Sequence, residues 1–465
     1  MTGEATTTMR ALKTDLYQLT MAAAYFHRGF EPTRVTCEAF MRRLPPRRRF
    51  VMMAGLQRVA TYLRELSFTA DEIAYLREVP MMRAAMTPAF CDYLARFRFT
   101  GELWAQPEGT VSFAREPLLR ITAPIIEAQL AETFVLSVLN HGVKVASKAA
   151  RVVLAAAPAK VVEFGGRRTH DEAAVDAARA AVVAGCAATS NVEAGMRHGL
   201  PLTGTMAHMW VMAHARPGVA DQDSERLAFA HWVETFPDAA ILLIDTYDSL
   251  RGVRMAIEAA GQKLKAVRLD SGDLDALSRD ARKLLDAAGL KHTTIVASSG
   301  LDEHAVARLR ESGAPIDSYG VGENIVEPVD APITGIVYKL VENHTARRSV
   351  AKKSSGGKAT LPGVKQVRRT VVDGRMVGDE IGLASEGPGG LLVQAMADGA
   401  VLPEGAATWQ LEVARARGAA ELAALPDDMR VIPGDPAREG KDEYPVKLSP
   451  LLDGLSQRLW SGADH

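Results

Sequence analysis

Cysteine is scarce in this chain of 465 residues: it occurs three times, at Cys37, Cys91 and Cys186. Three widely separated cysteines argue against a framework of disulfide bonds, and no two of them have the spacing of paired metal ligands. We therefore expect three buried thiols in a reducing compartment, and a fold that is stabilised by its apolar core.

Long apolar runs are missing as well. No stretch approaches the roughly 20 apolar residues that a membrane-spanning helix needs. The segment from Met1 to Gln18 mixes Thr, Glu, Arg, Lys and Asp and lacks the apolar run of a secretory signal peptide. These two absences predict a soluble, cytoplasmic protein with no membrane partner.

Neither sign of charge is in excess, because 55 Lys and Arg residues face 56 Asp and Glu residues, for a net charge of -1. This balance gives no general attraction to nucleic acid or to an anionic membrane. The basic run from Arg42 to Arg49 has no interleaved aromatic residues and lies in no basic domain. We expect it to form a solvated loop, or a loop that faces phosphate at a dimer interface.

What the chain does contain is material for a large folded core, since 47% of its residues are hydrophobic and 24% are charged. Its length suits about three domain-sized units, or one large barrel with additions. We predict an N-terminal α+β domain over residues 1–123 and a catalytic β/α barrel over 124–345. A C-terminal segment, 346–465, is expected to pack back on both.

Short apolar runs alternate with helical patterns in the middle of the chain. The runs predict strands at 160–164, 186–189, 202–205, 240–245, 264–269, 293–297, 316–321 and 336–341. Several intervening helices begin at aspartate and end at glycine, as helix capping favours, at 171–185, 273–289 and 302–313. Seven or eight such repeats predict a parallel sheet in a closed or nearly closed β/α barrel, with an open doubly wound sheet as the alternative.

Polar residues follow seven of these predicted strands. The segments are 163–170, 189–191, 204–208, 245–248, 268–273, 298–300 and 320–324. Active sites of β/α barrels lie at the carboxyl ends of the strands. Seven polar strand ends in register therefore predict a binding pocket at that edge of the sheet.

The residue types in this pocket suit an anionic, phosphorylated substrate. Small residues near the sixth and seventh strand ends can cradle phosphate on backbone N–H groups, and arginines can neutralise phosphate or grip a carboxylate. Aspartates can hold ribose hydroxyls or Mg²⁺, and an aromatic ring can stack on a flat substrate. These residues are Ser299, Gly300, Gly320 and Gly322; Arg167, Arg168 and Arg268; Asp270 and Asp273; and Phe164.

The same segments carry a family resemblance. The segment Thr14-Asp15-Leu16-Tyr17-Gln18-Leu19-Thr20 closely resembles the N-terminal signature of nicotinate phosphoribosyltransferases. Further matching segments follow in the family's order and spacing, with weaker echoes at 361–363 and 444–446. They are Glu163-Phe164-Gly165 with Arg167-Arg168, Thr189-Ser190-Asn191, Gly204-Thr205-x-Ala207-His208, Ile244 to Tyr247, Val267 to Asp273, and Tyr338-Lys339-Leu340.

The resemblance implies a type II phosphoribosyltransferase fold, in which an N-terminal domain packs beside an irregular β/α barrel. The same resemblance implies a homodimer whose sites are shared between subunits. It also implies ATP, Mg²⁺ and phosphoribosyl pyrophosphate as reactants, without a metal site made of side chains alone. Individual positions inherit roles by similarity: Tyr17 reaches the neighbour's nicotinate, Phe164 faces the pyridine ring, and Thr205 and Arg268 contact nicotinate. Arg167, Asp270, Ser299 and Gly322 resemble residues that hold phosphoribosyl pyrophosphate, and His208 resembles the histidine that ATP phosphorylates.

The residue at position 190 bears on the choice of substrate. The related nicotinamide phosphoribosyltransferases have an aspartate at the matching place, which accepts a hydrogen bond from the amide. Ser190 can instead donate to the carboxylate of nicotinate, which an aspartate would repel. The serine therefore favours the acid, although transfer to nicotinamide or to another pyridine acid remains an alternative. Quinolinate, with its second carboxylate, should demand a more basic pocket.

Glu323-Asn324 departs from the family pattern, which has small or hydroxyl residues after the second glycine. A carboxylate beside phosphate is costly unless Mg²⁺ or an arginine intervenes, so we expect Glu323 to point away from the phosphate. The departure also allows a catalytically silent paralogue that binds nucleotide. Four residues also have a structural role as an alternative to a functional one. Phe164 could belong to the core, Asp245 and Tyr247 could brace the barrel, and Asp273 could cap a helix.

Overall fold

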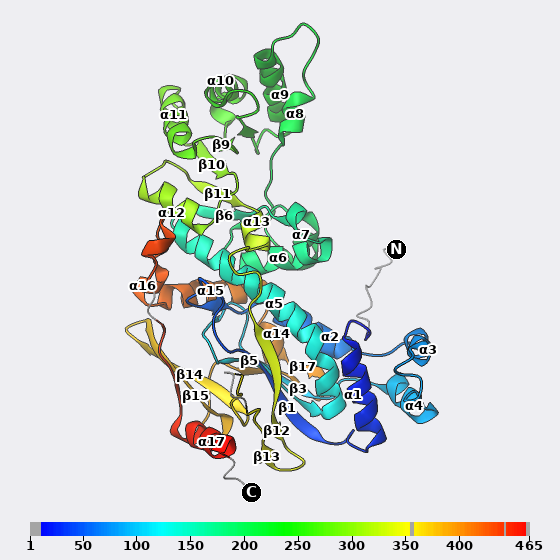
Figure 1. Cartoon of the computed structure of the whole chain (residues 1–465). Coiled ribbons are helices and arrows are strands. Elements are labelled where there is room, and N and C mark those ends of the chain that lie inside the picture. Colours follow the sequence, from blue (N-terminus) through cyan, green and yellow to red (C-terminus); the bar gives the residue numbers. More distant parts are fainter. Residues whose placement is uncertain (1–10, 354–357, 441–442, 462–465) are drawn as a thin grey trace. The chain divides into compact units, whose positions relative to one another are not determined.

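The computed structural model describes residues 11–353, 358–440 and 443–461, so the first ten residues of the polar N-terminal stretch lie outside it. The chain folds into two compact units (Figure 1). As far as these segments are described, the first unit comprises Met1–Ser147, Asp330–Pro426 and Asp442–His465, and the second Lys148–Val329 and Asp427–Lys441. Helix α5 (Ile125–Ala156) begins in the first unit and ends in the second.

A seven-stranded antiparallel sheet forms the centre of the first unit, in the described part of the chain. Its order is β13-β12-β1-β5-β3-β16-β17. The strands are β1 (Arg34–Met41), β3 (Glu102–Ala105), β5 (Pro117–Pro124), β12 (Ile336–Asn343), β13 (Arg348–Ser349), β16 (Val393–Ala397) and β17 (Ala400–Val401). Seven of the eight residues of β1 are buried, because the strand lies between two neighbours within the unit's main core.

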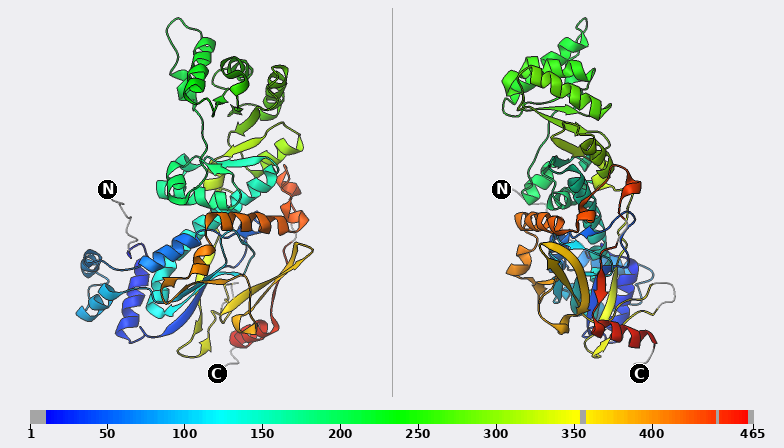
Figure 2. Two further views of the ribbon diagram at one scale, coloured as in Figure 1. Left: turned by 180° about the vertical axis from the view of Figure 1, so that it is seen from behind. Right: turned by 90° about the vertical axis from the view of Figure 1, so that its left-hand side faces the viewer.

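Helices and three smaller strand pairings complete the first unit. Tyr62 on α2 (Leu56–Glu65) stacks on Phe134 of α5 at 3.8 Å between ring centroids and joins these two helices in the core. Figure 2 shows the last helix beside the long hairpin of β14 and β15. The helices are α1 (Leu16–His27), α2 (Leu56–Glu65), α3 (Ala70–Glu78), α4 (Pro88–Arg96), α14 (Pro403–Ala407), α15 (Leu411–Ala424) and α17 (Pro450–Ser461); the strands are β2 (Val51–Met52), β4 (Val111–Ser112), β14 (Lys365–Val372), β15 (Arg375–Leu383) and β18 (Val446–Leu448).

The second unit contains the predicted parallel sheet. Within the described residues it has six strands in the order β7-β6-β11-β10-β9-β8, all parallel. They are β6 (Lys160–Glu163), β7 (Ala188–Thr189), β8 (Ile241–Leu243), β9 (Ala266–Leu269), β10 (Thr294–Ser298) and β11 (Ser318–Val321). The sheet is a curled half-barrel, which confirms the predicted α/β class of the fold.

Two of the eight predicted repeats do not join this sheet, so the barrel has fewer strands than the sequence pattern suggested. The run at 202–205 makes a single parallel bridge, from Leu202 to Thr189. The run at 336–341 becomes β12, which pairs antiparallel with β1 in the first unit. Its residues alternate between buried and partly exposed at first, which is typical of an antiparallel strand covered on one face.

Helices connect the parallel strands, and their starts follow the capping signals. Asp273 accepts hydrogen bonds from the backbone N–H groups of Asp275 and Ala276, and Asp302 accepts one from Ala305. Asp171 lies in the first turn of its helix, and His170 is the capping residue. The connecting helices are α6 (Asp171–Val183), α7 (Val192–His198), α8 (His208–Met212), α9 (Asp221–Thr235), α10 (Ser249–Ala260), α11 (Leu274–Ala287) and α12 (Glu303–Glu311). The unit also contains α13 (Glu323–Val326), which follows β11, and α16 (Asp427–Arg430) in its later segment.

A buried ion cluster ties α12 to α5 in the second unit. The Glu303 carboxylate is fully buried, 2.5 Å from Lys148 Nζ and 2.9 Å from Arg151 Nε. Burial by itself raises the pKa of Glu303, but the two cations outweigh it and lower that pKa from 4.5 to about 2. The ionised cluster therefore stabilises the folded state above pH 4.5, and this contribution is lost as the pH falls from 4.5 toward 2.

Glu303→Gln is expected to lower the free energy of unfolding at pH 7 by about 3 kcal/mol, since each pKa unit corresponds to about 1.4 kcal/mol. Urea unfolding between pH 7 and pH 3 measures this, with Glu258→Gln on the exposed side of α10 as the control. The difference from the unsubstituted protein should shrink below pH 4.5. A difference that stays constant down to pH 3 would show that ionisation of Glu303 contributes nothing.

No helix in the described part of the chain is long and apolar enough to cross a membrane.

Candidate active site

The carboxyl ends of the six parallel strands meet at one edge of the sheet, because parallel strands all point the same way. All but one of the predicted site residues lie in the second unit, at or after these strand ends. They are Phe164, Arg167, Ser190, Thr205, His208, Arg268, Asp270, Ser299, Gly300, Gly320 and Gly322. Tyr17 lies on α1 in the first unit, where half of its surface is exposed.

Phe164, which follows β6, lies between a glycine and an arginine. A Cβ atom on Gly320 would stand 2.5 Å from the Phe164 ring, so the ring fits only over glycine at this position of β11. On another side, Arg268 Cζ lies 5.6 Å from the ring centroid. The backbone N–H of Phe164 donates to the Val321 carbonyl at 2.9 Å. The ring is thus held in the site rather than in the core, and it is partly exposed there.

Arg268 and Asp270 form a hydrogen-bonded pair at the end of β9. Arg268 Nη2 donates to Asp270 Oδ1 at 2.9 Å, and Arg268 Nε donates to Ser298 Oγ at 2.9 Å. The Ser298 hydroxyl in turn donates to Asp270 Oδ1. Burial raises the pKa of Asp270, but the bonds from Ser298 and Arg268 and the nearby His208 outweigh it, so that pKa lies below its usual value. Asp270 is therefore an anion at neutral pH.

Ser298 is a site residue that the sequence analysis did not select. It ends β10, while the analysis chose the following Ser299 and Gly300. The register offered a signal: Val296 pairs with Arg268, so Ser298, two residues later, points to the same face of the sheet. The hydroxyl that contacts Arg268 could have been found from that alternation once the strand order was known.

His208, the first residue of α8, lies beside two other strand ends. Its Nδ1 is 3.1 Å from Thr246 Oγ1, and its Nε2 is 3.9 Å from Asp270 Oδ2. Asp245 supports this group from behind, since its Oδ2 accepts bonds from Asp270 N at 3.0 Å and Ser271 Oγ at 2.5 Å. The imidazole side chain is 40% exposed, so a ligand at this edge can reach it. Asp245 thus positions Asp270 and Ser271 at this edge, which goes beyond the plain brace of the barrel that the sequence analysis gave as its structural alternative.

The turn after β10 has an unusual backbone. Ser299 has a φ of 146° and Gly300 a φ of 54°, and a non-glycine residue with such a φ is strained and often marks a functional site. Asn324 holds this turn, because its Nδ2 donates to the carbonyls of Gly300 at 3.1 Å and Leu301 at 3.0 Å. Asn324, which departs from the family pattern, thus supports the turn expected to bind phosphate.

Glu323, which also departs from the family pattern, pairs with an arginine. Glu323 Oε2 lies 3.4 Å from Arg168 Nε, and both side chains are about half exposed, at 52% and 55%. The arginine partner fits the expectation that a carboxylate near phosphate needs a neutralising neighbour. The pair also links α13 to the 3₁₀ turn Gly166–Arg168, which contains Arg167.

Because Glu323 is paired and solvent-exposed, Glu323→Ala is expected to change the KM for phosphoribosyl pyrophosphate by less than about threefold, the effect of a weak surface ion pair. Steady-state kinetics with varied phosphoribosyl pyrophosphate measures this. Arg168→Ala, which breaks the same pair from the other side, is the matched variant. A loss of phosphoribosyl pyrophosphate binding in Glu323→Ala alone would show that the carboxylate acts in the site itself.

Ser190 and Thr205, two further predicted contact residues, are positioned by hydrogen bonds to main-chain carbonyls. Ser190 is exposed, and its backbone N–H donates to the Glu163 carbonyl at 3.1 Å. The Thr205 hydroxyl donates to the Ile241 carbonyl at the start of β8. Thr205 has therefore used its proton within the protein, and its oxygen can only accept a bond from a ligand.

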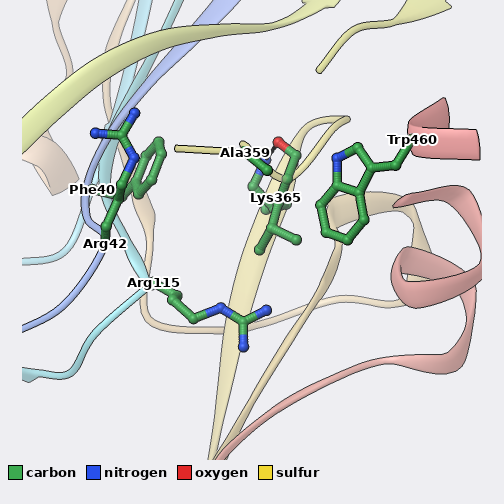
Figure 3. Close-up of a pocket in the computed structure, with 7 residues that line it drawn as sticks. Phe40, Arg42, Arg115, Ala359, Lys365 and Trp460 are labelled. Atoms are coloured by element: carbon green, nitrogen blue, oxygen red, sulfur yellow. Dashed lines mark hydrogen bonds between the residues drawn. The ribbon is translucent and has the colours of Figure 1, made fainter. Parts of the chain in front are cut away.

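A separate cavity of about 200 Å³ lies in the first unit (Figure 3). Arg42 and Arg115 reach it with their side chains, and the Trp460 ring faces it. Lys365 is buried below, with its Nζ bonded to Glu38 and to main-chain carbonyls.

Arginine, aspartate, histidine and a strained glycine-containing turn at the carboxyl edge of a parallel sheet define an α/β enzyme site for phosphorylated, anionic ligands. Comparison with known proteins narrows the class. Residues 12–140 match the model of the nicotinate phosphoribosyltransferase N-terminal domain, and residues 159–370 match the model of the nicotinate phosphoribosyltransferase family. The chain belongs to the nicotinate phosphoribosyltransferase family.

Individual relatives agree with this assignment. The chain is 43% identical to nicotinate phosphoribosyltransferase pncB2 of Mycobacterium tuberculosis, over 97% of this chain and 94% of that protein. It is 39% identical to nicotinate phosphoribosyltransferase of Bacillus subtilis, over 78% of this chain and 73% of that protein. The crystal structure of human nicotinic acid phosphoribosyltransferase matches with a TM-score of 0.79 and 27% identity, over 96% of this chain and 99% of that one.

Proposed function

We propose that this protein joins nicotinate to phosphoribosyl pyrophosphate, forming nicotinate mononucleotide and pyrophosphate, as a step of NAD salvage in the cytoplasm. The observation that carries the proposal is the meeting of Phe164, Arg268, Asp270 and His208 at one edge of the parallel sheet. An aromatic ring, a cation and an anion suit nicotinate and its phosphorylated co-substrate, and a histidine can accept a phosphoryl group from ATP. Relatives along nearly the whole chain carry the matching name.

In the proposed nicotinate site, Phe164 and Arg268 have different roles. Phe164 supplies a flat surface for the pyridine ring, and Arg268 supplies charge for its carboxylate. Two of the Arg268 nitrogens are already bonded, which fixes the guanidinium plane, while Nη1 makes no bond with the described residues. Exposed Ser190 can add a hydroxyl donor to the carboxylate, and this favours nicotinate over the uncharged nicotinamide.

His208 is proposed as the acceptor of a phosphoryl group from ATP. In the tautomer with its proton on Nδ1, the imidazole donates to Thr246 and keeps a lone pair on Nε2 for attack on phosphorus. The phosphorylated ring then carries negative charge close to Asp270, and relief of that repulsion on hydrolysis gives a physical route for coupling ATP to the transfer.

The side chains of the site suit a Mg²⁺ ion that binds together with the substrate phosphates. No cluster of three metal-ligating side chains occurs in the described ranges, and Mg²⁺ is usually held by one or two carboxylates together with substrate phosphates. Asp270 keeps its Oδ2 free of hydrogen bonds to the described residues, while Oδ1 is occupied by Arg268 and Ser298. Bound there, Mg²⁺ would neutralise charge on the departing pyrophosphate.

The glycosyl step then needs positioning more than a protein nucleophile. The pyridine nitrogen attacks C1 of the ribose as the pyrophosphate departs, through a state that resembles an oxocarbenium ion. Phe164 and Arg268 orient the ring, Asp270 can hold ribose hydroxyls, and backbone N–H groups of Ser299, Gly300 and Gly322 can bind phosphate.

We further propose a homodimer in which Tyr17 of one subunit completes the site of the other. Its support is the exposed position of Tyr17 on α1, in a unit without the strand-end residues. Mixing Tyr17→Ala subunits with Arg268→Ala subunits should restore up to about a quarter of the wild-type activity, because half of the dimers are mixed and each has one intact site. The activity of the mixture measures this, and tagged, purified heterodimers should reach about half of the wild-type activity, since one of their two sites is intact. Verified heterodimers as inactive as either parent would contradict sharing.

The direct test of the proposed function is product formation from nicotinate or nicotinamide with phosphoribosyl pyrophosphate and Mg²⁺, with and without ATP. We expect nicotinate mononucleotide to form faster with ATP, and little amide product. A folded protein that makes neither product would support the silent paralogue. Faster formation of nicotinamide mononucleotide, or of the product from another pyridine acid, would support the other alternative.

A further inference from the structure

Glu163 is a buried acidic residue to which the proposed reaction has so far given no role. It is the last residue of β6, directly before Phe164, and only 1% of its surface is exposed. It forms no ion pair with the described residues, whereas buried carboxylates usually have a cation or a metal as partner. Burying a carboxylate without a cation costs free energy, so the position of Glu163 beside Phe164 needs a physical explanation.

The carboxylate accepts one hydrogen bond from each of two neighbouring strand ends. Oε1 accepts from the backbone N–H of Gly165, just after Phe164, and Oε2 accepts from the Thr189 hydroxyl at 2.6 Å, just before Ser190. Ser190 also donates its backbone N–H to the Glu163 carbonyl at 3.1 Å. Glu163 thus connects the segment that carries Phe164 with the segment that carries Ser190.

Tight packing leaves this connection little freedom. A Cβ atom on Gly165 would clash with a Val326 methyl group and stand 2.9 Å from Glu163 Oε1. The Thr189 oxygen, while donating to Glu163, also accepts the backbone N–H of Asn191 at 3.0 Å. The turn after β6 and the turn after β7 are therefore both fixed to one carboxylate.

Only an ionised carboxylate satisfies both donors as they stand. A carboxylate accepts at both oxygens, whereas a glutamine side chain accepts at one end and donates at the other. Burial outweighs the other influences and raises the pKa of Glu163 above its usual value, while the bonds from Thr189 and Gly165 act in the opposite direction and favour the ionised form. A glutamine in place of Glu163 would face the Thr189 hydroxyl with a second donor, unless that hydroxyl turned and gave up its present bond.

We propose that Glu163 is a positioning residue for the nicotinate subsite, which sets the spacing between the Phe164 ring and the Ser190 hydroxyl by holding Gly165 and Thr189. This inference rests on the proposed function, because it assigns Phe164 and Ser190 to the same ligand. It makes no claim on the phosphate turn or on His208, whose supports come from other strands.

The test is the affinity for nicotinate alone, measured by calorimetry on the full-length protein. Glu163→Gln and Thr189→Val each break the connection from one side and should weaken nicotinate binding about tenfold, the loss of one hydrogen bond to a charged group. Thr189→Ser keeps the hydroxyl and should bind within about twofold of wild type. Glu234→Gln, on the exposed side of α9, is the charge-matched control.

Two further readouts separate positioning from general damage to the fold. The double variant Glu163→Gln, Thr189→Val should bind no more weakly than either single variant, since both remove the same connection. In turnover, KM for nicotinate should rise about tenfold while kcat changes by less than about threefold. Labelling of His208 by ATP, measured without nicotinate, should stay within about twofold of wild type.

Each outcome decides the question. Wild-type affinity in both Glu163→Gln and Thr189→Val, with thermal melting that shows them folded, would overturn the proposal. An equal loss of kcat, of ATP labelling and of thermal stability would assign Glu163 to the fold in general and also overturn it. A wild-type protein that binds nicotinate without turning it over would refute the proposed function alone, and the affinities would still test Glu163. A wild-type protein that neither binds nicotinate nor turns it over would refute both. If nicotinate binds only in turnover, an unchanged KM for nicotinate in both variants would overturn the proposal for Glu163.

Discussion

Replacement of His208 by alanine is expected to abolish transfer of a phosphoryl group from ATP to the protein and to remove the stimulation of turnover by ATP. The imidazole is the reacting group, and alanine offers no atom that can accept phosphorus. Its neighbours, Thr246 at 3.1 Å and Asp270 at 3.9 Å, orient the ring but cannot replace it. Turnover without ATP should persist, because Phe164, Arg268 and Asp270 remain.

Labelling with ATP that carries a radioactive γ-phosphate measures the first effect, and acid lability of the label identifies a phosphohistidine. The control is His292→Ala. This exposed histidine precedes β10 and so lies at the amino end of that strand, away from the site. A label that stays stably bound to the His208→Ala protein would refute the assignment. A His208→Ala protein with full ATP stimulation would refute the coupling even if the label were lost.

Arg268→Ala is expected to lower kcat/KM for nicotinate by about 1.5–3 kcal/mol, or roughly 10- to 150-fold, the range for hydrogen bonds that involve a charged group. The loss has two sources. The carboxylate of nicotinate loses its cation, and Asp270 and Ser298 lose the guanidinium that now bonds to both at 2.9 Å. Arg268→Lys should recover only part of the loss, since an ammonium group cannot make the same fork of bonds.

Steady-state kinetics with varied nicotinate measures this effect, with Arg254→Ala on the exposed side of α10 as the control. The pH dependence gives a second readout. Arg268 contributes to the lowered pKa of Asp270, so its removal should move the acid limb of kcat/KM to higher pH. An unchanged kcat/KM would remove Arg268 from the site.

The local elements of the second unit were predictable because their signals are short-range. Asp273 and Asp302 cap their helices, as the spacing from aspartate to glycine indicated. Six of the eight apolar runs became strands of one parallel sheet. The other two predictions were wrong for this sheet, because an apolar run of four to six residues does not determine which strand it pairs with. Residues 336–341 pair with β1, and Leu202 makes a single bridge to Thr189.

The chemical character of the site could also be predicted, and its detailed contacts could not. Arg268 and Asp270 were expected at the edge that they occupy, but the role of Ser298 between them depends on the register of β9 and β10. The Glu323 carboxylate looked costly beside phosphate, and its pairing with Arg168 depends on how α13 follows β11 next to the turn after β6. Contacts between residues more than 20 positions apart require the strand order.

The sequence by itself determined which residue types stand at each strand end, where the capped helices begin, and to which family the chain is similar, because these properties lie within a few residues of chain. The tertiary structure decided which of these groups meet. Glu163 contacts Thr189 across 26 residues, and His208 contacts Thr246 across 38. The physical reason is that a hydrogen bond acts over about 3 Å, so only strand order, register and the packing of turns determine which donors and acceptors come within that distance.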